Sequence, residues 1–402
     1  MAIPLNVGLG RLSPAGEFRE LINLDTPPRF EEAGTYESAT ATFRLRDKNL
    51  AYTAMRGEWH LQVVDRVTGS LLFRGLVRQP SRQMVVTEHG IDVVADDMSV
   101  LLDRLCITSR GEVRAGGETL RARIAWLFGS LKHGDGSAWS STKVAQPLLD
   151  AGFDYTTFVK QLDTNLPRQT FPPNLTLRQA LERILSAVDN GSGPNSANYY
   201  VAWPYLHVFD DDNTESTRTA PYDINAAHSP GAGKVAPEDL NVDWDTTRLV
   251  NGYYVRGKNS AGSGFYTDQD LLAGPWSVNL FGLRVAYLDG PDADTAAKAV
   301  RLAKAALRDT RNPVPRITFS LTGSAKIANG SARWQGGQLV YVTSAAQGLN
   351  GSGADAGPWA GPVALQPFRV AHLTRTLISG DGEWSNEVEV GGRKRRPAYS
   401  GT

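Results

Sequence analysis

Apolar and polar positions alternate along much of the C-terminal part of the chain, between residues 249 and 390. Successive side chains of a strand point to opposite faces, so this period of two predicts β-strands. One long helical pattern interrupts the series at residues 292–309, and Val300, Ala303 and Leu307 have the spacing of its buried face. A helix buries its apolar stripe readily on a sheet, which predicts a small closed sheet with one helix packed against it. The predicted strands are residues 249–257, 316–321, 338–344, 368–378 and 384–390.

The N-terminal part shows a similar β pattern without the long helix. Residues 40–45 alternate, and two pairs of apolar runs flank turns that contain Gly69 and Gly90. Glycine suits such turns because it reaches positive φ without steric cost. A helical stripe then follows Asp96 or Asp97, either of which can cap it. Several short strands closed by a helical turn predict a compact barrel or sandwich.

The middle of the chain mixes helical and strand patterns. Apolar residues recur at helical spacing over residues 118–132 and again over 177–188, where Thr176 is the expected N-cap. Residues 199–209 predict a hairpin with Pro204 at its turn. The following segment, 210–237, is rich in Asp, Thr, Gly and Pro, which indicates a linker or a long surface loop.

These patterns divide the chain into four parts. A chain of 402 residues is long enough for several domains. The predicted fold class is mainly β, with an α+β middle section and two related small β-barrels. The predicted domains are a first β-barrel (1–107), a helical and loop intermediate domain (108–170), an α+β domain with its linker (171–239), and a second β-barrel (240–402) with long Gly- and Trp-containing loops and a basic tail.

Composition narrows the possible functions. Lys and Arg number 42, as do Asp and Glu, so the chain has no overall basic excess with which to hold a polyanion. This balance argues against stable nucleic-acid binding, which draws mainly on phosphate contacts. The lone cysteine, Cys106, lies in an apolar run, which predicts a buried, inert thiol and excludes an intrachain disulfide.

The chain shows no sign of a membrane span or a secretory signal. No apolar run approaches the ~20 residues that a span requires, and residues 1–10 lack the charged and apolar regions of a signal peptide. We therefore expect a protein that is made in a cytoplasm and is soluble there. It could still be exported as part of a larger assembly.

No motif for catalysis or metal binding is evident. The six histidines do not pair at ligand spacing, and one cysteine cannot supply a zinc site. Residues 210–221 look like a calcium loop, but Glu215 stands where Gly is required and Pro221 where a bidentate Glu belongs. Nucleophile-elbow, phosphate-loop and metalloprotease motifs are absent. We expect no cofactor, no metal and no enzymatic activity.

Three aspartates, Asp289, Asp292 and Asp294, precede the long helical pattern. Carboxylates at a helix start accept hydrogen bonds from free backbone N–H groups and interact favourably with the helix dipole. Capping therefore explains these residues better than catalysis.

Two Gly-rich loops in the last domain carry aromatic residues, at 258–283 and 348–361. Long loops on compact domains are usually functional or mobile. Their aromatic side chains either contact a neighbouring chain or pack on their own domain. The basic tail at 391–397 is either a solvated terminus or a contact for phosphate or an acidic partner. The candidate partner-contact residues are Tyr266, Trp276, Phe281 and Trp359.

Several short motifs follow one another in a distinctive order. They are D-x-x-T-G at 65–69, L-F-R-G-x-V at 72–77, I-x-V-x-A-x-D at 91–97, T-L-R-Q-A-L at 176–181, L-V-N-x-Y-x-V-x-G at 249–257 and E-V-E-V-G at 387–391. This order resembles that of the minor tail or baseplate hub proteins of long-tailed bacteriophages. The resemblance spans most of the chain.

The resemblance implies a structural role at the tip of a phage tail. Hub proteins of this family form homotrimers in which two related barrels per chain make a ring of six. Such a ring joins the six-fold tail tube to a three-fold fibre or spike and lets DNA pass during ejection. The implied partners are tail tube and distal tail proteins, the tape measure protein, and fibre or spike proteins. The implied location is the virion tail tip, after synthesis in the host bacterial cytoplasm.

Two other functions are compatible with a β-rich chain. A carbohydrate-binding module for host recognition would also expose Trp and Tyr, because sugars stack on aromatic faces. Some hub proteins carry a C-terminal peptidase or lysozyme domain, so a cell-wall hydrolase is a further alternative. The chain stops soon after the predicted second barrel, so we expect that activity to be absent or supplied by another protein.

Overall fold

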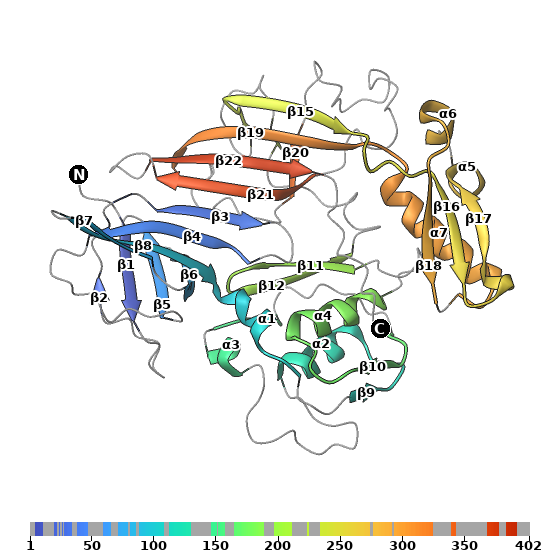
Figure 1. Ribbon diagram of the computed structural model, residues 1–402, viewed down its shortest axis with the longest axis horizontal. Helices are drawn as coiled ribbons and strands as arrows, with labels where there is room; N and C mark the ends of the chain where they lie inside the picture. The colour runs from blue at the N-terminus through green and yellow to red at the C-terminus, as the bar shows by residue number, and fades with distance from the viewer. Residues whose placement is uncertain are drawn as a thin grey trace.

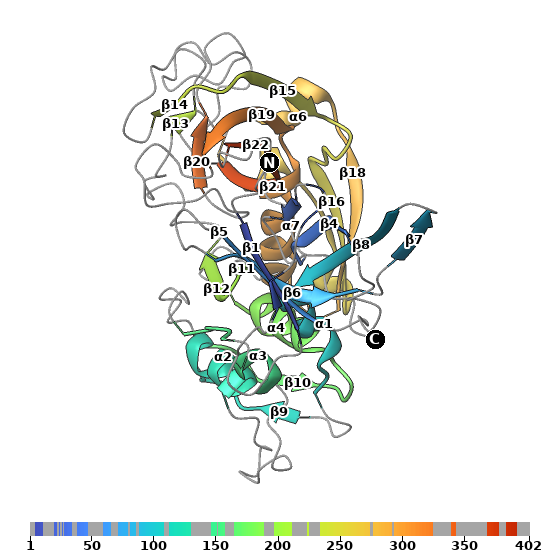
Figure 2. The same cartoon turned by 90° about the vertical axis from the view of Figure 1, so that its left-hand side faces the viewer.

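The computed structural model arranges the chain as a large sheet with a helical region below it and a smaller unit beside it (Figure 1). A second view, turned by 90° about the vertical axis, shows the C-terminal strands, the N-terminal strands and the helical middle in succession from top to bottom (Figure 2). The structure describes residues 5–10, 20–21, 24, 26, 28–33, 38–46, 59–65, 71–78, 81–85, 88–107, 112–129, 146–150, 152–156, 165–188, 197–210, 223–224, 234–273, 276–291, 293–324, 339–342, 368–377 and 383–391.

The N-terminal strands form where apolar positions alternate. Their bounds are β1 (Leu5–Gly10), β2 (Glu20–Leu21), β3 (Arg29–Ala33), β4 (Thr40–Arg46), β5 (His60–Asp65), β6 (Leu71–Val77), β7 (Ser81–Val85) and β8 (Glu88–Asp97). In β4, Ala41, Phe43 and Leu45 are buried and the positions between them are only partly so. Both predicted hairpins form, since β5 pairs with β6 and β7 with β8, each antiparallel. The predicted turn at Gly90 is wrong, because Gly90 lies within β8 opposite Gln83 and the last pair before the turn is Val85 with Glu88.

A short helical segment follows β8, as predicted. It consists of a 3-10 helix, η1 (Met98–Val100), and α1 (Leu101–Arg104). Asp97 is the N-cap, and its carboxylate accepts a hydrogen bond from the Ser99 backbone N at 2.8 Å. Cys106 is exposed, so the prediction of a buried thiol is wrong. The chain is extended after α1, which turns Ile107 into the core and Cys106 outward.

One hydrophobic core unites the helical middle region. Its elements are β9 (Glu112–Arg114), α2 (Leu120–Gly129), α3 (Gln146–Asp150), β10 (Gln169–Phe171), α4 (Leu177–Ser186), β11 (Ala197–Ala202) and β12 (Tyr205–Asp210). Thr176 caps α4 as predicted, in a capping box with Gln179: each side chain accepts a hydrogen bond from the other residue's backbone N, at 3.1 and 3.0 Å. The predicted hairpin with Pro204 at its turn is β11 and β12. The core extends from Leu102 to Val208, across both predicted intermediate segments.

The C-terminal strands continue the same large sheet. Their bounds are β13 (Asp223–Ile224), β14 (Lys234–Val235), β15 (Asp239–Asp245), β19 (Val314–Ser324), β20 (Leu339–Val342), β21 (Phe368–Leu377) and β22 (Glu383–Gly391). Four predicted strands are thus confirmed, and Ile317, Phe319 and Leu321 alternate inward along β19. The predicted linker contributes β13 and β14, which pair in parallel with each other, while β13 also pairs with β20.

Between β15 and β19 the chain leaves the large sheet and folds an inserted unit, residues 246–313. Its elements are β16 (Gly252–Gly257), η2 (Ser260–Gly262), β17 (Gly264–Thr267), α5 (Asp268–Leu271), α6 (Ser277–Phe281), β18 (Val285–Gly290) and α7 (Ala296–Thr310). The strands form their own sheet in the order β17-β16-β18. The predicted long helix is therefore confirmed as α7, but it packs on this small sheet and not on the strands that follow it. Its apolar stripe indicates a buried face without specifying which sheet covers that face.

The N-cap of α7 is Thr295, whose hydroxyl accepts a hydrogen bond from the Lys298 backbone N at 3.4 Å. Asp289 and Asp294, the two of these aspartates that the structure describes, do not cap the helix as predicted. Asp294 instead pairs with the Lys298 side chain at 2.8 Å, and Asp289 lies 3.5 Å from Arg256 on the surface. Asp292 lies outside the described residues.

The buried face of α7 consists of residues four positions apart. Ala303 and Leu307 are fully buried, as predicted. Val300 is only half-buried, and the third fully buried member is Ala299. Residues 299, 303 and 307 lie above one another along a helix, so they follow the contact stripe more closely than residue 300 does.

The described strands are mostly antiparallel and none of their sheets is closed into a barrel. The mainly β class with an α+β middle is thus what the chain adopts. In the described part of the chain, no helix is both long and apolar enough to cross a membrane.

Candidate functional site

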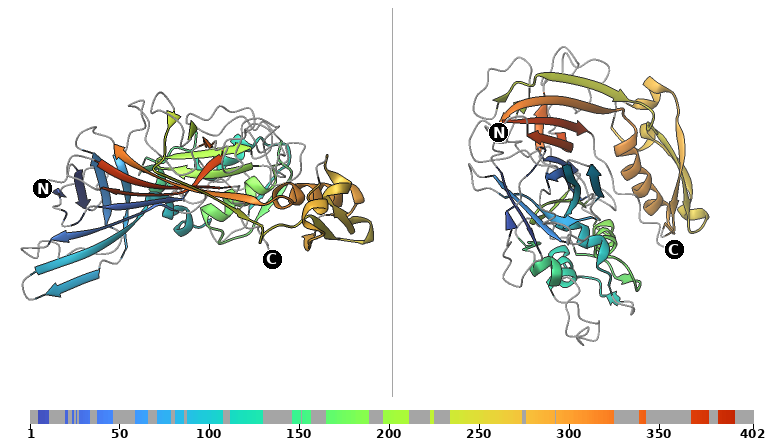
Figure 3. Two further views of the ribbon diagram at one scale, coloured as in Figure 1. Left: turned by 90° about the horizontal axis from the view of Figure 1, so that it is seen from above. Right: turned by 60° about the vertical axis from the view of Figure 1, so that its left-hand side comes forward.

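The N-terminal and C-terminal strands join edge to edge through β3 and β21. These strands pair antiparallel, with Phe30 opposite Arg375 and Glu32 opposite Leu373. On their other edges, β3 pairs with β4 and β21 with β22. One hydrogen-bonded ladder therefore runs from β15 through the junction to β5 and β1 (Figure 3). Two halves of the chain that are far apart in sequence form a single continuous wall.

An ion pair is buried on the inner side of this junction. Arg375 is 2% exposed, and its guanidinium pairs with the carboxylate of Glu32. Burial lowers the pKa of Arg375 to about 9. The adjacent carboxylate favours the charged guanidinium, so the pair remains ionised at neutral pH. Phe30 and Trp384 pack beside the junction with ring centroids 5.9 Å apart, which leaves the pair among apolar side chains.

The opposite face of the C-terminal strands is polar. Thr318 and Ser320 of β19 point away from the buried positions, and a shallow groove of about 360 Å³ lies over them. Asp239, Glu387 and Glu389 contribute carboxylates to the groove. Its lining also includes a histidine but no lysine or arginine. A surface of this composition repels phosphate groups.

Neighbouring groups orient the acidic side chains of the groove. Arg316 donates a hydrogen bond to Glu389 at 3.0 Å, which raises the pKa of Arg316. Ser320 donates its hydroxyl hydrogen to Asp239 at 3.1 Å. In the described part of the chain, no group of three or more His, Cys, Asp or Glu residues is arranged to hold a metal ion.

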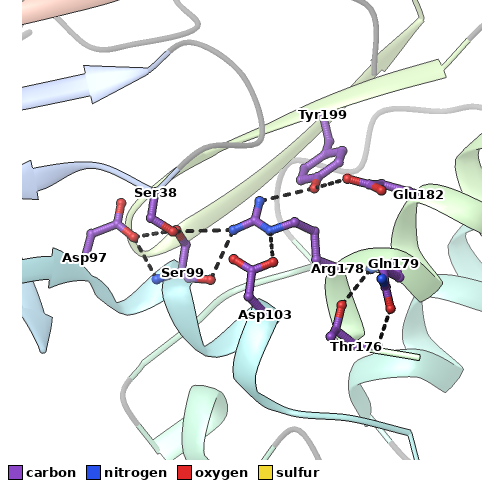
Figure 4. Close-up of polar contacts among 9 residues, drawn as sticks. All are labelled: Ser38, Asp97, Ser99, Asp103, Thr176, Arg178, Gln179, Glu182 and Tyr199. Carbon is purple, nitrogen blue, oxygen red and sulfur yellow. Dashed lines mark hydrogen bonds and ion pairs between the residues drawn. The ribbon is translucent and has the colours of Figure 1, made fainter. Parts of the chain in front are cut away.

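A second polar cluster joins the N-terminal strands to the helical middle (Figure 4). Arg178 of α4 donates to Asp103 of α1 at 2.6 Å and to the Tyr199 hydroxyl at 3.3 Å. It also reaches Ser38 and the Ser99 carbonyl, each at 3.4 Å. Burial lowers the pKa of Arg178, but Tyr199 and Asp103 raise it by more, so the net shift is upward and the side chain stays charged. Arg178 thus connects α4 to β11 through Tyr199, and to the segments next to β4 and β8 through Ser38, Ser99 and Asp103.

Asp97 lies at the edge of the same cluster. Its carboxylate accepts hydrogen bonds from the backbone N of Ser99 at 2.8 Å and of Ala39 at 2.9 Å, and from the Ser99 hydroxyl. Burial nevertheless raises the pKa of Asp97 to about 6. Desolvation disfavours the charged carboxylate by more than these donors favour it.

This shift predicts a pH dependence of stability. In the unfolded chain Asp97 titrates near pH 4, so the folded protein binds the proton more tightly. The stabilisation from Asp97 is fully present below about pH 4 and is lost as pH rises through 6, a change of about 3 kcal/mol. Asp97→Asn removes the titration at the expense of one hydrogen bond at every pH. Urea unfolding from pH 4 to 7 should show a smaller fall in stability for the variant, and parallel curves for both proteins would contradict the assignment.

Three of the four candidate contact residues from the sequence are described, and all three lie half-buried in the inserted unit. Tyr266 packs against the core of the inserted unit beneath α7. Trp276 is half-buried and donates its indole N–H to the Leu272 carbonyl at 2.8 Å. Phe281 ends α6 and is half-buried. Trp359, with its loop, lies outside the described residues, as do the basic tail after Gly391 and most of the calcium-like loop.

Sequence reasoning missed the residues that hold the regions together. Arg178 belongs to the motif at 176–181, but nothing local marks it as buried. Glu32 and Arg375 are 343 positions apart, so no periodicity relates them. The exposed aromatics of the inserted unit, Tyr254 and Tyr287, were also missed, although their alternation with buried neighbours is a signal that could have found them.

Comparison of the sequence with known proteins finds no relatives. No family model matches the chain. No curated protein matches it either. Any likeness therefore rests on the fold.

Three solved structures share the fold over nearly the full chain. A tail protein from Neisseria meningitidis MC58 has a TM-score of 0.60 at 15% identity and covers 96% of each chain. The 43 kDa tail protein of prophage MuSo2 from Shewanella oneidensis has a TM-score of 0.62 at 12% identity, over 96% of this chain and 98% of that one. Prophage tail protein gp18 from Listeria monocytogenes EGD-e has a TM-score of 0.55 at 11% identity, over 97% and 95%. Over nearly its whole length, the chain has the fold of these three phage tail proteins.

Proposed function

We propose that this protein is the structural hub at the tail tip of a long-tailed bacteriophage. The observation that carries the proposal is the continuous sheet through β3 and β21. One side of this sheet is apolar and faces the hydrophobic core, and the other side carries a polar, acidic groove. A wall of this kind suits a ring through which DNA passes without being held. The fold shared with phage tail proteins supports the same role.

In this proposal each half of the chain supplies one β-sheet module to the ring. Three copies then provide six modules, which match a six-fold tail tube above and present three-fold symmetry to a fibre or spike below. The strands at the open edges of the sheet present backbone N–H and C=O groups that favour pairing with another chain. Contacts between copies would supply that pairing. Tail tube and distal tail proteins, the tape measure protein, and the fibre or spike are the proposed partners.

The polar groove would face the DNA path. Wild-type protein should then leave duplex DNA unshifted in a gel at low salt, because its carboxylates repel phosphate. Asp239→Lys together with Glu387→Lys should create binding that weakens steeply as salt is raised. A matched pair of acid-to-lysine changes at Asp150 and Asp289, on other exposed surfaces, is the control. If both double variants bind DNA equally well, the groove does not face the DNA path.

The proposed role is structural, and opening of the cell wall falls to another protein. Gold-labelled antibody against this chain, applied to intact phage particles, tests the location. We expect label at the distal end of the tail. Label along the tail shaft or on the fibres would contradict the proposal.

A further inference from the structure

One face of the small sheet in the inserted unit is apolar and uncovered. Tyr254 of β16, Phe265 of β17 and Tyr287 of β18 point to this face and are 40%, 46% and 73% exposed. Val285 and Leu283 extend it at one end. Gly252 lies beneath the Phe265 and Leu283 side chains, which occupy the space a larger residue would need. We call these residues the tyrosine face.

No described part of the same chain can cover this face. The opposite side of the sheet packs on α7 through Val255, Ala299 and Ala303. Figures 1 and 3 show α7 between the small sheet and the rest of the molecule, so the tyrosine face points outward. The largest apolar patch on a typical monomer covers about 300–600 Å² and is often functional, so this face is a candidate for contact with another molecule.

The geometry of the rings favours a protein partner over a sugar. Tyr254 and Tyr287 lie with centroids 5.7 Å apart but at an interplanar angle of 66°. Sugars stack on a flat aromatic platform, and rings at this angle do not make one. A surface with its own edges and rings can interdigitate with them instead.

The charges on the face complement a copy of themselves. Arg256 and Asp289 lie opposite one another in register, with their charged groups 3.5 Å apart and 68% and 74% exposed. Tyr254 lies opposite Tyr287 in the same two strands. A two-fold axis parallel to the strands, between β16 and β18, places each member of these pairs over its partner in a second copy. Arg256 then meets Asp289 twice, and Tyr254 meets Tyr287 twice.

We propose that the tyrosine face binds the same face of a second copy of this chain. The proposed axis brings β16 and β18 of the two copies together, and Tyr254, Tyr287 and Val285 then offer an exposed apolar area on the order of 300 Å² per copy, since each large side chain offers roughly 150–250 Å² when fully exposed. Two copies bury about twice that, which together with the charged pairs stays below ~1,200 Å² and fits a weak, reversible contact. The contact lies on the inserted unit and does not use the large sheet, so it does not depend on the proposed ring.

Native mass at concentrations up to tens of micromolar tests the pairing. A closed two-fold contact gives two chains, or six if the proposed three-fold ring also forms. One chain or three would overturn the inference. A mass of two chains would support the face-to-face pairing and count against the ring. A mass of three chains would support the ring and count against the pairing, so the two proposals can fail separately.

Variants of the face then identify the contact. Tyr287→Ser should raise the dissociation constant at least about tenfold, as expected for a central aromatic anchor. Val113→Ser, at an exposed apolar position of β9, should leave it unchanged. The far-UV circular dichroism of each variant checks that the fold is intact. If both variants pair equally well, the assignment is overturned. It is also overturned if Tyr287→Ser loses retention on a glycan column while its native mass stays the same, because the face would then bind a sugar.

Charge reversal provides the sharpest test. Arg256→Asp gives a face with two acids, and Asp289→Arg gives a face with two arginines. Each variant alone should pair at least about tenfold more weakly than wild type, because like charges meet across the axis. A mixture of the two variants should recover pairing as a mixed dimer, although neither chain regains its internal ion pair. A mixture that pairs no better than its components would contradict the proposed geometry.

Discussion

Replacing Arg375 with methionine should lower the free energy of unfolding by about 3 to 5 kcal/mol. Arg375 is 2% exposed and its partner Glu32 is 15% exposed, so the substitution removes the guanidinium from a buried ion pair in a largely dry site. Breaking a buried ion pair is far more costly than losing a surface pair. The effect falls on the junction between β3 and β21, which joins the two halves of the wall.

Two further variants separate this effect from general damage. Arg29→Met breaks an ion pair with Glu31 on the same β3 strand, but at an exposed position, and should cost at most about 1 kcal/mol. Glu32→Leu combined with Arg375→Met removes both charges and should be less damaging than Arg375→Met alone. Denaturant unfolding measures all three. A loss for Arg375→Met no greater than that for Arg29→Met would show that the junction does not depend on the buried pair.

Truncation of Leu307 to alanine should cost about 2 to 5 kcal/mol of stability in the inserted unit. Leu307 is fully buried on the α7 face that also carries Ala299 and Ala303. Removal of its side chain leaves a cavity beneath a helix that supports the small sheet from one side only. The tyrosine face lies on the other side of that sheet, so its shape depends on this packing.

Lys304→Ala is the matched control on the same helix, because Lys304 is exposed. Alanine is a strong helix former, so this variant should change stability by less than about 0.5 kcal/mol. Hydrogen exchange of residues 252–257 and 285–290, read with denaturant unfolding, localises the effect. An unchanged unfolding midpoint for Leu307→Ala would show that the helix packing is not what stabilises the unit.

Local patterns were sufficient to predict most individual elements. Alternation at Ala41, Phe43 and Leu45 marks β4, and the same alternation marks β19. Capping chemistry located the starts of two helical segments, at Asp97 and Thr176. These signals lie within a few residues of one another, so a sequence displays them directly.

Long-range pairing could not be predicted in the same way. The junction of β3 with β21 joins segments more than 300 residues apart, and strand edges carry no label for their partner. For the same reason α7 was recognised but assigned to the wrong sheet. The exposure of Cys106 was missed because an apolar neighbourhood in sequence does not determine the direction of one side chain in an extended segment.

In the candidate site, too, single residues could be predicted from the sequence but their contacts could not. Glu387 and Glu389 were visible within a predicted strand, but their place beside Asp239 depends on the pairing of β15, β19 and β22. Arg178 and Arg375 are charged residues at buried positions, against the usual preference of charges for solvent. Only the folded chain shows that each meets a carboxylate.

We propose that copies of this chain assemble into a ring with three-fold symmetry. Native mass measurement of purified protein, with negative-stain class averages of the same sample, is the decisive experiment. We expect a mass that is a multiple of three chains and class averages with three-fold symmetry around a central hole. A mass of only one or two chains at every concentration, with particles that lack a hole, would contradict it.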